Sequence, residues 1–269
     1  MLSATTVLSR DGVQIADVAC TYGQGRGAPG EQKGGHALVF VRRGCFVRSA
    51  GGEEALLDPT LAYCINPGAE ERYDHPHAHG DRCTSLGITP ELVEALWGGE
   101  RELPSRALPN SPDTDLEQRL LLAAAARGAD GHELVERAIA LAASLLASAD
   151  PRRVASGRPS TAHTRRALAD GAREALAADP NRSLPALAAD LTVSPHHLSR
   201  VFREMTGHTL ARHRMRLRAR AALERLAGGE GNLARLAADL GFADQSHLCR
   251  VLHGETGGVP SALRRALAA

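Results

Sequence analysis

The feature that most constrains the fold of this chain is an internal repeat near its C-terminal end. Residues 187–191 (LAADL) recur as residues 236–240, and residues 197–202 (HLSRVF) recur with small changes as residues 247–252 (HLCRVL). The offset is 49 residues for the first pair and 50 for the second, so one residue is inserted between them. Each copy has the apolar spacing of a short amphipathic helix, a tight turn and a second helix. The repeat therefore predicts two similar supersecondary units in one chain.

The second helix of each unit has a clear start signal. Ser194 in the first copy and Asp244 in the second are good N-caps, because their side-chain oxygens accept a hydrogen bond from the first helical turn. Pro195 follows at the first helical position, where no N–H is needed. Two short helices across a tight turn form the helix-turn-helix layout, whose second helix can enter the major groove. The apolar faces are predicted to consist of Leu187, Leu191, Leu198, Val201 and Phe202, and of Leu236, Leu240, Leu248, Val251 and Leu252.

Polar side chains remain on the outer face of each second helix. Arg can donate two hydrogen bonds to guanine, and Gln can pair with adenine, which is the chemistry that base reading requires. The candidate DNA-binding residues are His196, Ser199, Arg200 and Arg203 in the first copy and Gln245, Ser246, His247 and Arg250 in the second. Between the copies, residues 210–226 predict one helix of about 25 Å. This helix would set the two reading helices about one DNA turn, roughly 34 Å, apart.

The charges of the chain separate along its length. The total is 32 Lys and Arg against 31 Asp and Glu, but residues 164–269 hold 16 Arg and 10 acidic residues, a net charge of +6, and the remainder has a net charge of −5. A basic module joined to an acidic one is expected of a DNA-binding unit with a separate sensing unit. Some arginines of the connecting helix are expected to reach phosphates and others to pair with acidic groups; they are Arg212, Arg214, Arg216, Arg218 and Arg220.

Residues 182–265 resemble the AraC/XylS family of transcription regulators. The residues that carry the resemblance are Gly241, Phe242, Asp244, Ser246, Leu248, Arg250, Gly257, Pro260 and Arg264. Leu248, Leu252 and Leu263 stand where the family commonly has aromatic residues, which suits a chain with only 3% aromatics. The resemblance implies base contacts from the positions that correspond to the candidates above, Arg203 excepted. It also implies an N-terminal cupin-like β-barrel followed by helices for dimerisation.

The N-terminal part of the sequence agrees with that architecture. Up to about residue 88 it is rich in glycine turns and short apolar runs, which predict strands near residues 37–41, 45–47, 55–57 and 61–65 and a small barrel or two-sheet roll. Helical periodicity follows at residues 91–97, 113–127 and 132–147. The predicted fold class is α+β with two domains. The sequence predicts a sensing and dimerisation domain at residues 1–148, a linker at residues 149–162 and a DNA-binding domain at residues 163–269.

The two longer helices of the N-terminal part carry Leu and Ala stripes. These stripes are Leu116, Leu120 and Ala124 in one helix and Leu134, Ile139, Leu141 and Leu145 in the other. They predict a homodimer interface, with closure onto the barrel as the alternative.

The unusual chemistry of the N-terminal part is a group of cysteines and histidines. In an extended segment, alternate residues face the same way, so the histidines would share a face with Asp81 and a cysteine. Imidazole and thiolate suit zinc or another transition metal. The candidate metal-binding or thiol-sensing residues are Cys64, His75, His77, His79 and Cys83.

Three other interpretations of this region remain open. The segment can be a hydrophilic loop beside structural cysteines. It can be a thiol sensor, in which Arg82 lowers the pKa of Cys83 and Cys64 is the resolving or structural partner. The barrel can also hold an organic effector, with lining residues drawn from Phe40, Phe46, Tyr63 and Tyr73.

A transcription regulator, not an enzyme, is the function that this sequence favours. The predicted partners are an operator in double-stranded DNA, an effector, a second copy of the chain and, for an activator, RNA polymerase. The alternative is a metal-dependent cupin enzyme fused to a DNA-binding module. A DNA-repair methyl acceptor needs a compact four-thiolate zinc site, and the wide spacing of Cys20, Cys45, Cys64 and Cys83 disfavours it. No apolar run of 18 residues and no signal peptide is found, so a cytoplasmic protein without a membrane span is expected.

Overall fold

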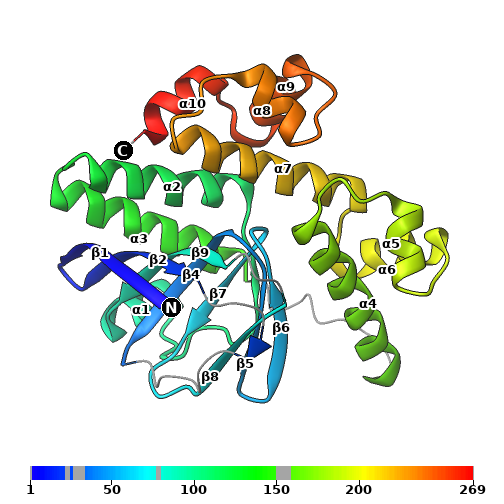
Figure 1. Cartoon of the computed structure of the whole chain (residues 1–269). Helices are drawn as coiled ribbons and strands as arrows, with labels where there is room; N and C mark the ends of the chain where they lie inside the picture. Colours follow the sequence, from blue (N-terminus) through cyan, green and yellow to red (C-terminus); the bar gives the residue numbers. More distant parts are fainter. Residues whose placement is uncertain (1, 22–24, 27–33, 77–79, 150–158, 269) are drawn as a thin grey trace.

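The computed structural model of the chain describes residues 2–21, 25–26, 34–76, 80–149 and 159–268. A β-rich N-terminal part is followed by helices that continue to the C-terminus (Figure 1). The strands are β1 (Leu2–Arg10), β2 (Val13–Cys20), β3 (Gly25–Arg26), β4 (His36–Arg43), β5 (Phe46–Ala50), β6 (Glu53–Leu57), β7 (Leu61–Ile65), β8 (Glu71–His75), β9 (Asp81–Ile88) and β10 (Leu108–Pro109). The helices are α1 (Pro90–Leu96), α2 (Pro112–Ala126), α3 (Gly131–Ala147), α4 (Pro159–Ala178), α5 (Leu184–Asp190), α6 (Pro195–Thr206), α7 (Leu210–Ala227), α8 (Leu233–Asp239), α9 (Gln245–Thr256) and α10 (Pro260–Leu267). The predicted α+β fold with two domains is confirmed.

Two antiparallel sheets form the N-terminal domain. The larger has the strand order β1-β2-β9-β4-β7-β10, and the smaller has the order β3-β8-β5-β6. The central strand β9 lies between β2 and β4, so it pairs with two segments that are far from it in sequence. In this register Cys20 lies opposite Asp81. The pairing of distant strands therefore brings the end of β2 to the start of β9.

The two faces of the larger sheet have different neighbours. Side chains alternate across a strand, and in β4 Val39 and Val41 pack with Phe46 of the smaller sheet. Leu38 and Phe40 of the same strand belong instead to the core beneath the helices. Phe40, one of the candidate effector-lining residues, therefore packs in this core, because its position in β4 turns it to the face opposite the smaller sheet.

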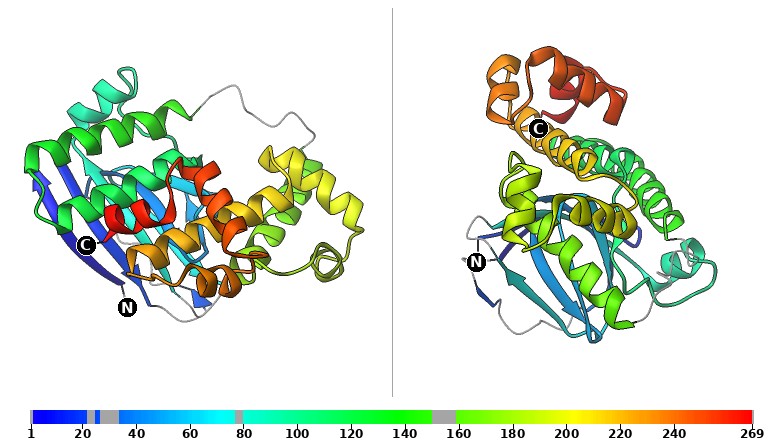
Figure 2. Two further views of the ribbon diagram at one scale, coloured as in Figure 1. Left: turned by 90° about the horizontal axis from the view of Figure 1, so that it is seen from above. Right: turned by 90° about the vertical axis from the view of Figure 1, so that its right-hand side faces the viewer.

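Helices α2 and α3 cover that opposite face of the larger sheet (Figures 1 and 2). Leu141 and Leu145 of α3 are buried in the core with the sheet. Leu116 and Leu120 of α2 point to the other side and pack against the core of the last helices. The stripe of α3 thus closes onto the barrel, whereas the stripe of α2 is shared between two parts of the molecule. A homodimer through these helices stays a prediction.

The C-terminal helices form two similar units along one long helix. The first core contains Leu198, Phe202 and Leu217, which come from α6 and from the first half of α7. The second contains Leu248 of α9 and Leu223 of the second half of α7, together with residues of α8 and α10. Helix α7 is therefore part of both units and holds them together (Figure 1).

One boundary differs from the sequence-based expectation. Helix α4 begins at Pro159, inside the predicted linker at 149–162. The Pro- and Arg-rich start of this helix has no apolar period of its own. Further along it, Ala169, Ala172 and Leu176 are buried in the first core, so packing on the following helices stabilises α4.

Among the described helices, none combines the length and the apolar character that a membrane span needs.

Candidate functional site

Helix α6, the second helix of the first unit, begins where the sequence predicts. Ser194 is its N-cap, and its Oγ accepts a hydrogen bond from the N–H of His197 at 3.2 Å. Leu198 and Phe202 are buried in the core shared with α4, α5 and α7. The cap fixes the first turn and the buried side chains fix the rotation of the helix about its axis. The polar face of α6 is consequently turned outward.

Helix α9 of the second unit is built in the same way. Asp244 is its N-cap, and the carboxylate accepts from the N–H of His247 at 2.6 Å. Leu248 and Leu252 are fully buried. Leucine thus fills core positions at which the family commonly has aromatic rings. Both capping predictions are confirmed.

Most of the predicted DNA-binding side chains lie on the outer faces of α6 and α9. Two of the eight, Ser199 and His247, are half-buried. The exposed ones are His196, Arg200, Arg203, Gln245, Ser246 and Arg250. Both helices therefore present an arginine to solvent at the corresponding position of the repeat.

The predicted DNA-binding side chains differ in how many hydrogen bonds and ion pairs they form within the chain. Arg200 donates to Glu204 one turn later at 2.9 Å. His247 accepts from the N–H of Ala243 at 3.3 Å and packs edge-on against the ring of Phe242. No hydrogen bond or ion pair joins the Arg250 guanidinium to the described part of the chain. Arg250 is thus the arginine best placed to bind an external group, and His247 also stabilises the turn.

The arginines of α7 are mostly engaged within the molecule. Arg212 is exposed, and the Arg216 Nε lies 3.7 Å from a carboxylate oxygen of Glu255. The others donate hydrogen bonds to main-chain carbonyls, a role that the sequence analysis did not predict; they are Arg214, Arg218 and Arg220. Of the five, Arg212 is the most exposed to solvent, so it is the strongest candidate for a phosphate contact.

In the N-terminal domain, one end of the sheets gathers a cluster of ionisable side chains. His75 Nε2 and Asp81 Oδ2 are 2.7 Å apart, and both side chains are buried. Cys20 lies close enough for ligand atoms of the three residues to fall within 4.8 Å of one another. The Cys83 thiol donates to the other oxygen of Asp81 at 3.5 Å. Cys20 was missed from sequence, because only the pairing of β2 with β9 places it there.

The remaining sensor candidates are placed differently from the expectation. Cys64 belongs to the core beneath α2 and α3, on the opposite face of the sheet from Cys83. Burial raises the pKa of Cys64 to about 12 and holds the pKa of Cys83 well above its usual value. Arg82 follows Asp81 on the alternate face of β9 and does not activate the Cys83 thiol. The expectation of a lowered pKa at Cys83 is therefore wrong. Cys64 is a buried core residue, which agrees with the structural alternative, but it lies on the wrong face of the sheet to resolve an oxidised Cys83. His77 and His79 lie outside the described residues.

The space between the two sheets is filled by rings and a buried ion pair. Phe46, Tyr63 and Tyr73 pack on one another with ring centroids 5.8 to 6.1 Å apart. Arg48 lies over the Tyr63 ring at 4.9 Å and forms an ion pair with Glu71 at 2.5 Å. The predicted effector-lining rings therefore contact each other.

Comparison with protein families identifies the type of domain that the C-terminal helices form. Residues 187–266 match the family model described as a helix-turn-helix domain. The C-terminal part of the chain is an AraC-type helix-turn-helix domain. The resemblance seen in the sequence is thereby confirmed for this domain. Comparison with curated proteins finds no significant match to the chain.

Several solved structures resemble the chain at low sequence identity. ToxT from Vibrio cholerae O395 is 10% identical, with 95% of this chain and 98% of that chain covered and a TM-score of 0.37. A DNA-binding transcriptional dual regulator from Escherichia coli K-12 is 18% identical over 37% of this chain and 91% of that chain, with a TM-score of 0.35. A cupin superfamily protein from Desulfitobacterium hafniense DCB-2 is 13% identical over 33% of this chain and 78% of that chain, with a TM-score of 0.28.

The AraC-type domain is held against the N-terminal domain by buried charges. Glu224 of α7 accepts from Arg119 of α2 at 2.5 Å, and Arg119 is itself buried. Asp58, in the turn between β6 and β7, accepts from Arg173 of α4 at 2.9 Å. The guanidinium beside Asp58 and the hydrogen bonds from Thr60 hold the pKa of Asp58 below its usual value, against the effect of burial. Each helix-turn-helix unit thus has a charged contact with the barrel side.

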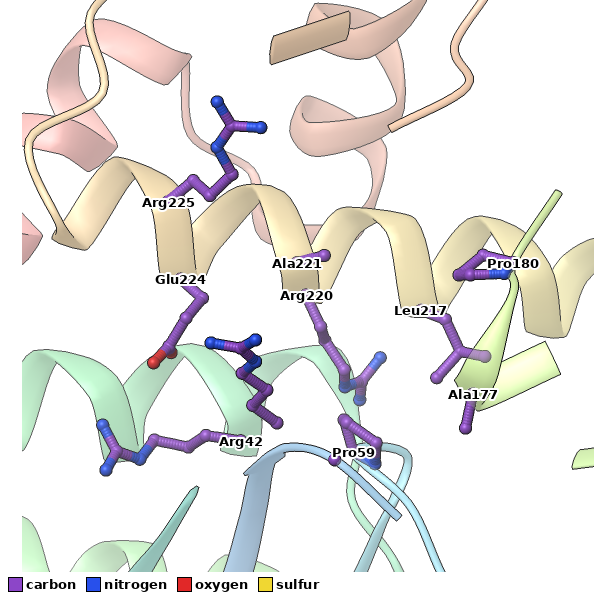
Figure 3. Close-up of a pocket in the computed structure, with 11 residues that line it drawn as sticks. Arg42, Pro59, Ala177, Pro180, Leu217, Arg220, Ala221, Glu224 and Arg225 are labelled. Atoms are coloured by element: carbon purple, nitrogen blue, oxygen red, sulfur yellow. The ribbon is translucent and has the colours of Figure 1, made fainter. Parts of the chain in front are cut away.

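A cavity of about 350 Å³ lies at the same boundary. Figure 3 shows Arg220 and Glu224 pointing from α7 toward Arg42 and Pro59, whereas Arg225 points away. Arg220 donates to the carbonyl of Asn110, so its guanidinium joins α7 to the segment that precedes α2. Around this cavity the contact between the domains is therefore polar and incompletely filled.

Proposed function

We propose that the chain is a sequence-specific transcription regulator in which α6 and α9 read two adjacent segments of the major groove. The observation that carries the proposal is the duplication of a capped helix with a buried apolar face and an exposed polar face. Arg200 and Arg250 occupy the same position in the two copies, and arginine is the side chain that pairs best with guanine. Gln245 adds the chemistry that recognises adenine.

Helix α7 supports reading by both units at once. It has 18 residues and is about 27 Å long, and it contributes side chains to both cores. Two reading helices fixed to one rigid helix bind neighbouring turns of the same DNA face, which are roughly 34 Å apart. Binding both segments together multiplies the effect of each contact on specificity.

The proposed input lies in residues 1–148, and the proposed DNA-binding domain begins with α4 at Pro159 and includes the helices that follow it. The contacts of Glu224 with the buried Arg119 and of Asp58 with the buried Arg173 support a coupling between the two domains, because a change at the barrel alters what these carboxylates contact. We propose an operator as the partner, a second copy of the chain as a dimer partner, and RNA polymerase if the regulator activates. The high pKa of the buried Cys64 and Cys83 thiols disfavours a thiol-reactive signal at these residues.

The test is operator discrimination by Arg200→Ala and Arg250→Ala. Each variant is compared with the wild type on an operator selected from random-sequence DNA and on a scrambled duplex. Losing one bidentate base contact costs about 1–3 kcal/mol of discrimination, roughly 5- to 150-fold. Arg250→Ala is the cleaner variant, since Arg200→Ala also releases Glu204.

The matched control is Arg72→Ala, which removes an exposed arginine from β8 of the N-terminal domain. This variant is expected to bind both duplexes as the wild type does. Unchanged discrimination in both Arg200→Ala and Arg250→Ala, with folding intact, would contradict the assignment of α6 and α9 as base-reading helices.

A further inference from the structure

The cluster at one end of the sheets unites three residues from three strands. Cys20 ends β2, His75 ends β8 and Asp81 begins β9. β2 and β9 are neighbours in the larger sheet, and β8 belongs to the smaller one. The three side chains are 5 to 8% exposed. The cluster therefore joins the two sheets at one end of their strands.

We propose that Cys20, His75 and Asp81 bind a divalent transition metal of the zinc class. A thiolate, an imidazole and a carboxylate are the donors that Zn²⁺ takes from proteins. Their atoms already lie within 4.8 Å of one another. With metal–ligand distances of about 2.1 Å and tetrahedral angles, ligand atoms are about 3.4 Å apart. The 2.7 Å contact between His75 and Asp81 would lengthen by less than one ångström.

One further observation points to a ligand at this place. Beside the cluster lies a cavity of about 260 Å³, lined by Cys20 and Asp81. The cavity gives an ion a path to the donors and leaves room for a water molecule as a fourth ligand.

Two glycines allow the backbones around the cluster to approach closely. Gly80 has φ +65°, and a Cβ there would lie 2.1 Å from the carbonyl oxygen of Cys20. Gly44 has φ +89°, and its Cβ would lie 2.5 Å from the carbonyl oxygen of Gly80. Both positions require glycine, for conformation and for space. They fix the backbone that carries Asp81 against the end of β2.

Neighbouring side chains orient the carboxylate and balance the charge. The Cys83 thiol donates to Oδ1 of Asp81 and leaves Oδ2 turned toward His75. Such outer hydrogen bonds commonly fix the ligands of a metal. A thiolate at Cys20 and a carboxylate at Asp81 supply two negative charges, which a divalent ion neutralises in this buried place.

The metal site does not depend on the proposed function. An effect of the metal on DNA binding rests on the proposed function. Arg82, next to Asp81, contacts Asp17 and lies 3.8 Å from Glu224 of α7. The contact gives the cluster a short path to the helix that both helix-turn-helix units share. A metal would thereby stabilise the part of β9 that faces α7.

The experiment uses the full-length reduced chain, stripped of metal with a chelator and titrated with Zn²⁺ and with Co²⁺. We expect one ion per chain and, with Co²⁺, the absorption band of a thiolate–cobalt bond. Cys20→Ser should remove this band, and Cys20→Ser and Asp81→Asn should each weaken Zn²⁺ binding at least about tenfold. The matched control is Cys64→Ser, which changes a buried cysteine on the opposite face and should keep the band and the affinity.

Wild-type protein without a thiolate–cobalt band would overturn the inference, whatever the variants do. The same holds if Cys20→Ser, with a circular dichroism spectrum like that of the wild type, binds Zn²⁺ as tightly as Cys64→Ser. Operator binding is measured separately with and without Zn²⁺. An operator affinity that is absent in both states would contradict the proposed function and leave the metal result intact.

Discussion

Replacement of Asp58 by Asn tests whether one buried carboxylate holds the two domains together. Asp58 is fully buried, and its Oδ1 accepts from the N–H and the hydroxyl of Thr60 at 2.7 and 2.6 Å. Its Oδ2 accepts from Arg173 of α4, and His213 Nε2 of α7 lies 3.6 Å away. Asn keeps the size of the side chain and removes its charge. The substitution therefore leaves the Arg173 guanidinium buried without its main counter-ion.

The expected magnitude follows from this burial. Removing one partner of a buried ion pair costs about 3–5 kcal/mol. Arg173 keeps a second contact with Asp170 at 3.0 Å, which places the expected loss near the lower limit, about 3 kcal/mol. A loss of about 3 kcal/mol is more than a hundredfold in an equilibrium constant. The free energy of unfolding of the full chain should fall by this amount.

The assay is urea unfolding, followed by helix circular dichroism and by the fluorescence of Trp97, the single tryptophan. The control is Arg127→Ala, which removes exposed hydrogen bonds to the carbonyls of Ala266 and Ala268 at the same domain boundary. It should cost less than about 1 kcal/mol. A double-mutant cycle with Arg173→Gln should give a coupling energy of at least about 1 kcal/mol. An Asp58→Asn effect no larger than that of the control, or full additivity in the cycle, would refute the reasoning.

Three further predictions concern stability and DNA binding. Burial lowers the pKa of His213 to about 4, below the unfolded value of about 6.5. Between these two pH values the unfolded state binds a proton that the folded state does not. The free energy of unfolding should therefore fall by about 1.4 kcal/mol for each pH unit as the pH is lowered from about 6.5 to 4. His213→Gln should flatten this part of the urea-unfolding profile, and an unchanged slope would contradict the assignment. Leu248→Ala should lower the free energy of unfolding by about 2–5 kcal/mol, because the side chain is fully buried in the second core; a calorimetric loss below 1 kcal/mol would argue against that core. Arg212→Ala should weaken operator and scrambled DNA alike and reduce the salt slope of binding by about one, whereas a loss confined to the operator would mean base reading.

The sequence was most informative where interactions are local. The caps Ser194 and Asp244 bind N–H groups three residues away, and the apolar spacing of α6 and α9 depends only on the helical period. Both helices, their starts and their outer faces were therefore predictable, as was the AraC-type domain that they form. The sheet strands β4 to β7 were also predicted near their observed positions. The start of α4 was not, because packing on later helices stabilises it.

Tertiary structure decided everything that depends on which distant segments meet. Cys20 joins His75 and Asp81 because β2 pairs with β9 and the second sheet packs against them. Cys64 is excluded because its place in β7 turns it to the other face of the sheet. The repeat and its polar helix faces thus come from local sequence, whose period and caps act within a few residues. The cluster of Cys20, His75 and Asp81 and the domain contacts depend on long-range pairing, which no short stretch of sequence encodes.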